Sequence, residues 1–220
     1  MKHIIYMRRF FICFLLAAIV SHGTMAQKLL KTVDWGMTDE TNKYCPEGKV
    51  TGTAAVAMSI VMNYHQWPLQ GTGSHSYYDS KSNTDHSVDF ESTSFDWNAM
   101  PGSITDCTEA QTDVMADLFY KCAVAANSYF HSSKTYTFCP ELSQALIGYF
   151  RYMPTTRTKD YSQIKEDDFA LLKKEIDEGR PVIGLVNFED SYYAAPTHIG
   201  RLRRGRISRS SLTSQLQLME

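Results

Sequence analysis

A regular spacing of apolar residues predicts the first strong helix of the chain, over 53–65. Its apolar positions share one helical face: Ala54, Ala57, Met58, Val61, Met62 and His65. Thr53 has a side chain suited to an N-cap, and Pro68 lies where the helix should have ended. The pattern therefore predicts a buried helix that starts at a turn of small residues.

Similar patterns predict the remaining elements. Helices are expected over 109–126, 140–150 and 167–178, and the continuous apolar run 181–188 is typical of a buried strand. Residues 71–94 are polar and small without a clear period, so loop and short strand are expected there. Helices should therefore dominate the first half of the chain and strands should begin in the second, which is an α+β order.

The first 26 residues form a separate unit. Basic residues precede the apolar run 10–20, and small residues stand at Thr24 and Ala26, the third-last and last positions of the unit. The run is too short to cross a bilayer. A cleaved signal peptide over 1–26, and so a secreted or periplasmic protein, is expected; a retained membrane anchor is the alternative.

The last residues also differ from the rest. Five arginines crowd between 201 and 209, and Glu220 is the only acid among the last thirty residues. A basic, Ser-rich tail over 199–220 is typical of disorder. A nucleic-acid or membrane-surface arm, or a reading frame that has left its ancestral sequence, are the alternatives, and the domain between signal peptide and tail is expected over 27–198.

Whole-chain composition and cysteine content add few constraints. With 220 residues and 12% aromatic content the chain can bury a sizeable core, and its net charge of −2 favours neither nucleic acid nor, after signal cleavage, a membrane as partner.

Four cysteines remain after cleavage of the signal peptide. The setting expected for an exported protein is oxidising, and four cysteines can form disulfides in three different pairings. The four cysteines are Cys45, Cys107, Cys122 and Cys139. Cys122 lies in an apolar helical pattern and is expected to be a buried free thiol. No clustered Cys/His spacing occurs, so neither a metal nor another cofactor is expected.

Several segments resemble, in order, those of one peptidase family. They are Gly52-Thr53-Ala54-Ala55-Val56-Ala57-Met58, Val61-Met62-Asn63-Tyr64-His65-Gln66-Trp67-Pro68, Gly73-Ser74-His75-Ser76-Tyr77, Phe95-Asp96-Trp97-Asn98-Ala99-Met100-Pro101, Cys122-Ala123-Val124 and Gly179-Arg180-Pro181-Val182. These residues resemble the streptopain family, secreted bacterial cysteine peptidases of papain-like fold. The similarity runs from about Trp35 to Phe188.

The resemblance implies an α+β, papain-like fold whose helical half is present and whose C-terminal β half is truncated. The family's Trp-Gly-Trp-Gly segment does not follow residue 198, so the second half is expected not to close, which would leave unpaired strand edges. An inhibitory propeptide is likewise expected to be missing, because only a short arm separates the signal peptide from the family region.

The resemblance also implies three site positions. Thr53 stands where the family has its nucleophilic cysteine, and Met37 stands where it has the oxyanion-hole glutamine. His198 has the spacing of the catalytic histidine but lacks the flanking glycines; an ordinary loop histidine is the alternative. His65 and His75 are expected to make local hydrogen bonds, and His86 and His131 to lie at the surface.

These replacements remove the chemistry that the family needs. A threonine hydroxyl stays protonated at neutral pH, and threonine nucleophiles generally use their own N-terminal amine as base. A thioether cannot donate a hydrogen bond to an oxyanion. We therefore expect a secreted cysteine-peptidase homologue that is inactive, with a peptide or protein as its ligand if it has one. The alternatives are residual proteolysis through Thr53 or Cys45, and a secreted inhibitor or adhesion module.

Overall fold

The protein is described by a computed structural model over residues 30–154, 157–160, 166–188, 191–197 and 215–218. Its α-helices are α2 (Thr53–His65), α3 (Glu109–Ala125), α4 (Cys139–Tyr149) and α5 (Glu166–Asp177), with short 3-10 helices η1 (Glu40–Asn42) and η2 (Trp97–Ala99). Every predicted α-helix is present, with each end within one residue of its expected position. The helical spacing of apolar residues was therefore a sufficient signal for these elements.

The strands form two separate sheets. β1 (Ser74–Asp79) and β2 (Thr84–Asp89) make an antiparallel hairpin. β3 (Arg157–Asp160), β4 (Val182–Phe188), β5 (Ser191–Thr197) and β6 (Gln215–Leu218) form an antiparallel sheet in the order β3-β6-β4-β5. The strand predicted over 181–188 is thus confirmed as β4.

The hairpin shows that strands begin earlier than predicted. Burial alternates along β1 and β2, but its inward positions include His75, Tyr77 and His86 rather than aliphatic residues. Burial that alternates every second residue is typical of a strand, and here polar aromatic residues occupy several of the inward positions. A search for alternating aliphatic residues therefore finds only loop and short strand over 71–94.

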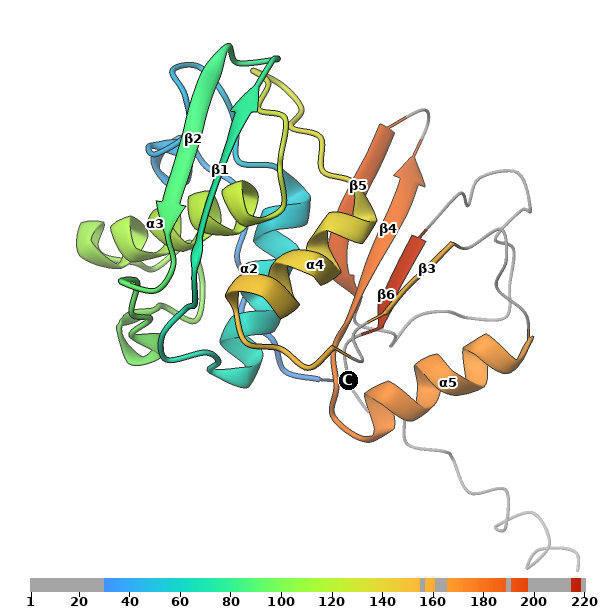
Figure 1. Cartoon of the computed structure of the whole chain (residues 1–220). Helices are drawn as coiled ribbons and strands as arrows, with labels where there is room; N and C mark the ends of the chain where they lie inside the picture. The colour runs from blue at the N-terminus through green and yellow to red at the C-terminus, as the bar shows by residue number, and fades with distance from the viewer. Residues whose placement is uncertain (1–29, 155–156, 161–165, 189–190, 198–214, 219–220) are drawn as a thin grey trace, which may run out of the picture.

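Helix α2 lies between α3, which belongs to the helical half of the fold, and the sheet that contains β4 and β5 (Figure 1). It contacts α3 on one side and strands β4 and β5 on the other, while α5 contacts β4. Residues Ala54 to Met62 of α2 are all buried. A helix that is apolar on every side belongs in a core, and its position between the two halves supplies that burial.

Strand β6 comes from the segment predicted to be a disordered tail. Residues Gln215–Leu218 pair with both β3 and β4, whereas the rest of 199–220 lies outside the described residues. The edge of β4 away from β5 carries backbone groups that need partners, and the alternating Gln-Leu-Gln-Leu sequence supplies a strand for them. The sequence predicted unpaired strand edges. On this side of β4, however, β6 forms backbone hydrogen bonds with the strand.

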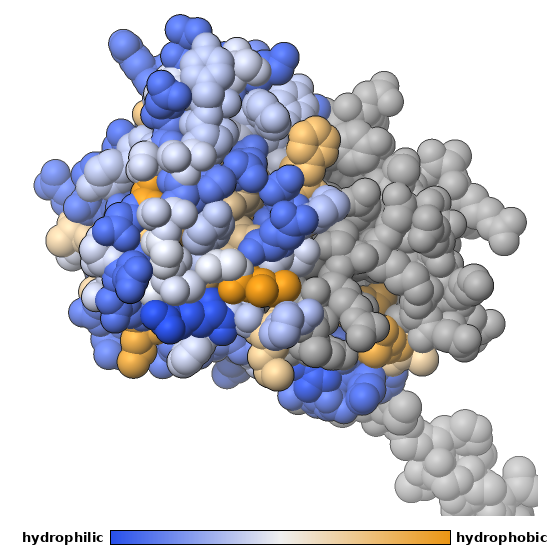
Figure 2. Space-filling view, in the orientation of Figure 1, coloured by the Kyte–Doolittle hydropathy of each residue, from blue (hydrophilic) through white to orange (hydrophobic). Residues whose placement is uncertain are grey.

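The surface of the helical half is mostly hydrophilic on the face that Figure 2 shows. Its apolar residues lie as separate spots there rather than as one broad patch. Large apolar side chains with more than half of their surface exposed include Leu69, Phe138 and Met153. Such isolated residues are normal on protein surfaces and do not by themselves mark an interface.

Candidate functional site

The candidate site lies at the N-terminal end of α2. Gly52 is the N-cap and has φ 96°, a conformation that side chains disfavour, and its carbonyl accepts the first helical hydrogen bond from the Val56 N–H. Thr53 is already the first helical residue. The predicted N-cap role of Thr53 is therefore wrong by one position, because the backbone turns at the glycine and Gly52 has no side chain with which to cap the helix.

Met37 reaches the same end of α2. Its Sδ accepts a hydrogen bond from the Gly52 N–H at 3.2 Å, and the side chain is 38% exposed. The structure thus places the Met37 sulfur against Gly52, the residue before Thr53. The sulfur acts as an acceptor here, so the contact is the reverse of the donation that an oxyanion requires.

His198 lies outside the described residues, so only the approach to it can be described. β5 ends at Thr197, the residue before His198, and this strand contacts α2. Two of the three predicted site residues are therefore brought together by the described structure.

The turn that leads into Thr53 is held from the N-terminal arm. Thr51 is fully buried, and its backbone N–H donates to Asn42 Oδ1 at 2.9 Å. Thr51 Oγ1 lies 3.0 Å from the same oxygen and 3.2 Å from Cys45 Sγ. This side of the turn is consequently fixed by buried polar contacts, which are costly to break.

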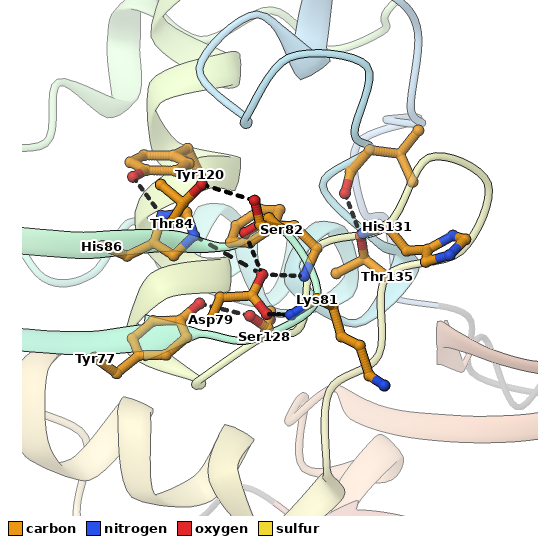
Figure 3. A network of polar contacts seen from close by, with 12 residues as sticks. Tyr77, Asp79, Lys81, Ser82, Thr84, His86, Tyr120, Ser128, His131 and Thr135 are labelled. Atoms are coloured by element: carbon orange, nitrogen blue, oxygen red, sulfur yellow. Dashed lines mark hydrogen bonds and ion pairs between the residues drawn. The ribbon is translucent and has the colours of Figure 1, made fainter.

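The loop that precedes α4 holds the same turn from the other side (Figure 3). The Val50 N–H donates to His131 O at 3.1 Å, and Thr135 Oγ1 donates to Val50 O. A Cβ on Gly52 would lie 3.0 Å from Thr135 Cβ. A side chain at position 52 would therefore crowd Thr135 and would be strained at this φ, so the turn before residue 53 is closely packed as well as hydrogen-bonded.

The two cysteines whose pKa is shifted are poor substitutes for the missing thiolate. Burial raises the pKa of Cys45 to about 11, although the contact with Thr51 opposes this. Burial also raises the pKa of Cys122 to about 12, and that side chain is completely inaccessible. Both are therefore protonated at neutral pH, and neither has the lowered pKa of a reactive cysteine.

The cysteine predictions can now be compared with the structure. The expected buried free thiol at Cys122 is confirmed. Of the three pairings that the sequence allowed, none is formed among the four described cysteines.

The histidines behave differently from one another. His75 makes hydrogen bonds with Tyr149 and Asn127 at 2.9 and 2.8 Å, but these partners are 74 and 52 positions away, so the contacts are not local in the sequence. His131 is exposed as predicted. The prediction for His86 is wrong, because this side chain is 2% exposed and its Nδ1 lies 3.0 Å from the Tyr120 hydroxyl. β2 alternates, so a histidine in a polar sequence still points inward.

Within the described part of the chain, no cluster of metal-binding side chains is present. The helices described there also include none that is long and apolar enough to span a bilayer.

The model of the peptidase C10 family matches residues 35–195. The chain belongs to the peptidase C10, or streptopain, family. The resemblance drawn from the sequence motifs is thereby confirmed.

Solved structures of a cysteine protease share the fold. Active wild-type interpain A, a cysteine protease of Prevotella intermedia, superposes with a TM-score of 0.71 at 20% identity, covering 86% of this chain and 92% of that one. A fragment of prointerpain A from the same organism gives a TM-score of 0.69 at 20% identity, with 86% and 70% coverage. The predicted α+β, papain-like fold is therefore confirmed.

A curated relative supports the same family. The thiol protease/hemagglutinin PrtT of Porphyromonas gingivalis is 27% identical over 136 residues, which is 60% of this chain. The aligned segment spans only 16% of the length of PrtT. The similarity therefore covers most of the present chain but only a small part of PrtT.

Sequence reasoning missed two residues: the buried Asp79 at the end of β1, and Thr135, which holds the turn before α2. A partial signal existed for Asp79, because an aspartate at the end of a strand before a Ser-Lys-Ser turn is typical of a side chain that caps the turn. Asp79 Oδ1 indeed accepts from the Lys81 N–H at 2.8 Å. No local pattern distinguishes Thr135, whose role depends on residues about 85 positions away.

Proposed function

We propose that this C10-family protein is exported and does not hydrolyse peptides through residue 53. The supporting observation is the arrangement at the N-terminus of α2, where the Thr53 position lies beside a Met37 sulfur that accepts the Gly52 N–H. A reactive thiol and a donor for the oxyanion are both replaced. Export is supported by the signal-peptide pattern of residues 1–26.

The physical argument starts from the nucleophile. Cysteine peptidases depend on a thiolate, which the dipole at a helix N-terminus helps to form. A threonine hydroxyl at the same place gains too little from that dipole to ionise near neutral pH, so it needs a base that removes its proton. Cys45 and Cys122 do not supply the thiolate, because burial keeps both protonated.

The oxyanion site adds a second, independent loss. Removing one hydrogen-bond donor to an oxyanion typically lowers the rate by about a hundred- to a thousandfold. Met37 provides no donor, and its sulfur already contacts the turn. The two losses together argue for an inactive homologue rather than a slow peptidase.

A secreted module that binds a peptide or protein is the second candidate. It is favoured by the support of the helix end, where Thr51, Asn42 and Thr135 still hold the turn although its residue 53 is unsuited to catalysis. A rigid site of this kind keeps a preorganised surface beside α2. We expect neither nucleic acid nor a membrane as partner, because the net charge of the whole chain is only −2.

The absence of hydrolysis is the first prediction. Purified full-length protein should give no turnover of a mixed fluorogenic peptide library at neutral pH, and a thiol-directed peptidase probe should not label it in a way that peptides block. Hydrolysis that disappears in a folded Thr53→Ala variant would contradict the proposal.

Binding can be tested separately with a substitution that fills the site. If the chain captures peptides from the same library, Thr53→Trp should reduce capture at least about tenfold, since a bulky ring would cover the end of α2. Glu91→Trp, at an exposed position beyond the hairpin, is the matched control and should leave capture unchanged. Absence of capture by the unmodified protein would reject the binding role while leaving the inactive-homologue proposal in place.

A further inference from the structure

A buried carboxylate lies at the end of the hairpin, away from the residues that the peptidase chemistry requires. The Asp79 side chain has no exposed surface. Its Oδ1 accepts from the Lys81 N–H at 2.8 Å, and its Oδ2 accepts from Ser82 Oγ at 2.6 Å and from the Phe130 N–H at 2.8 Å. The first two contacts lie within the hairpin turn, but the third reaches a residue 51 positions away.

That third contact leads directly to the supported turn at α2. Phe130 is followed by His131, whose N–H donates to Thr135 Oγ1 at 3.2 Å and whose carbonyl accepts from the Val50 N–H. Thr135 in turn donates to Val50 O and lies against Gly52. Figure 3 shows the contacts of Asp79 and those of Thr135 as two neighbouring groups, and the peptide bond from Phe130 to His131 joins them.

We propose that Asp79 is a positioning residue for position 53, acting through Phe130, Thr135 and the Val50–Gly52 turn. The carboxylate holds the Phe130 amide, and the hydroxyl of Thr135 transfers that restraint to the turn. Buried hydrogen bonds of a charged acceptor are the strong kind, and the alternative partner, water, is excluded from this site. The role concerns how residue 53 is held, so it does not depend on whether Thr53 reacts.

A cysteine placed at position 53 can report on this restraint. The thiol pKa of a cysteine at a helix N-terminus is lowered by the dipole and by nearby amides, and this effect depends on the geometry of the first turn. In a full-length Thr53→Cys protein, the rate of alkylation at residue 53 near about pH 6.5 measures the thiolate fraction. Peptide mapping by mass spectrometry separates this residue from the native cysteines.

Asp79→Asn in the Thr53→Cys protein should slow alkylation of residue 53 about tenfold, because the amide group cannot accept at both oxygen positions. Asp85→Asn is the matched control; it removes a carboxylate from the same hairpin at an exposed position and should leave the rate unchanged. Thr135→Val keeps the methyl group against Gly52 but removes the linking hydroxyl, so it should slow the reaction to a similar extent. The double variant should be no slower than the slower single variant if both residues act on one path.

The outcomes are distinct. Equal alkylation rates at residue 53 in all folded variants would overturn the inference, even if Asp79→Asn lowers the melting temperature, since that result describes a purely structural residue. If Asp79→Asn does not fold, unchanged reactivity in folded Thr135→Val protein would overturn it instead. Peptide hydrolysis by the unmodified protein would reject the proposed function and leave this inference standing.

Discussion

Replacing Arg180 with methionine should lower the free energy of unfolding by about 3–5 kcal/mol, because it leaves a buried carboxylate without its partner. The Glu175 side chain is 1% exposed, and Arg180 binds it with two nitrogens, Nε to Oε2 and Nη2 to Oε1, the latter at 2.8 Å. The pair connects the end of α5 to the start of β4. Methionine keeps most of the side-chain volume, so the lost energy reports the charge rather than a cavity.

Urea unfolding measures this loss from the change in midpoint at constant slope. Lys173→Met is the matched control on the same helix, because its ion pair with Asp177 joins side chains that are 61% and 47% exposed. An exposed pair of this kind contributes at most about 1 kcal/mol. If Arg180→Met cost no more than Lys173→Met, the pair between Arg180 and Glu175 would not stabilise the fold as described.

Acidification should destabilise the helical half through the buried pair Asp79 and His86. Burial lowers the pKa of His86, against the opposing charges of Asp79 and Asp85. Burial by itself raises the pKa of Asp79, but hydrogen bonds from Ser82, Lys81 and Phe130 outweigh it and leave that pKa below its ordinary value. Both groups therefore bind protons more readily in the unfolded chain than in the folded one.

The sign of the pH effect follows from these two directions. A group with a lowered pKa in the folded state contributes stability above its unfolded pKa, and that stability is lost as the pH falls. The stability contributed by His86 should begin to fall at about pH 6.5, and the stability contributed by Asp79 at about pH 4. We therefore expect the free energy of unfolding to fall below about pH 7 through His86, and to fall further below about pH 4 through Asp79.

The variant His86→Gln measures how much of the pH dependence of the unfolding free energy comes from His86. Glutamine does not titrate and can still bind the Tyr120 hydroxyl, so the stability curve should become flatter between about pH 6.5 and about pH 5. The other titratable groups near His86 are Tyr77, Asp79, Asp85 and Tyr120. His131→Gln is the exposed control, and an equal change of slope in both variants would show that burial at His86 is not the cause.

The helices could be predicted from the sequence because each is local. Ala57, Met58 and Val61 recur at helical spacing, and this spacing alone places α2 within the chain. The family resemblance also predicted that Thr53 and Met37 occupy catalytic positions, and this assignment stays a prediction. Neither conclusion required knowledge of the three-dimensional arrangement.

The inward histidine and the support of the helix end could not be predicted in this way. His86 is buried because Tyr120 and Phe130 cover β2, and both come from other elements. Asp79, Phe130 and Thr135 are brought to the turn at Val50 only by the folded chain. Pairing along β6 likewise depends on which strand edge it meets.

The sequence by itself therefore determined the local elements, the family and the residue identities at the tip of α2, because each depends on side-chain type and short-range spacing. The tertiary structure decided that the N-cap position falls on Gly52 rather than Thr53, that the Met37 sulfur contacts the turn, and that Asp79 binds the loop at Phe130. Those outcomes depend on contacts between residues far apart in sequence, whose free energies are set by burial and hydrogen-bond geometry and have no local signature.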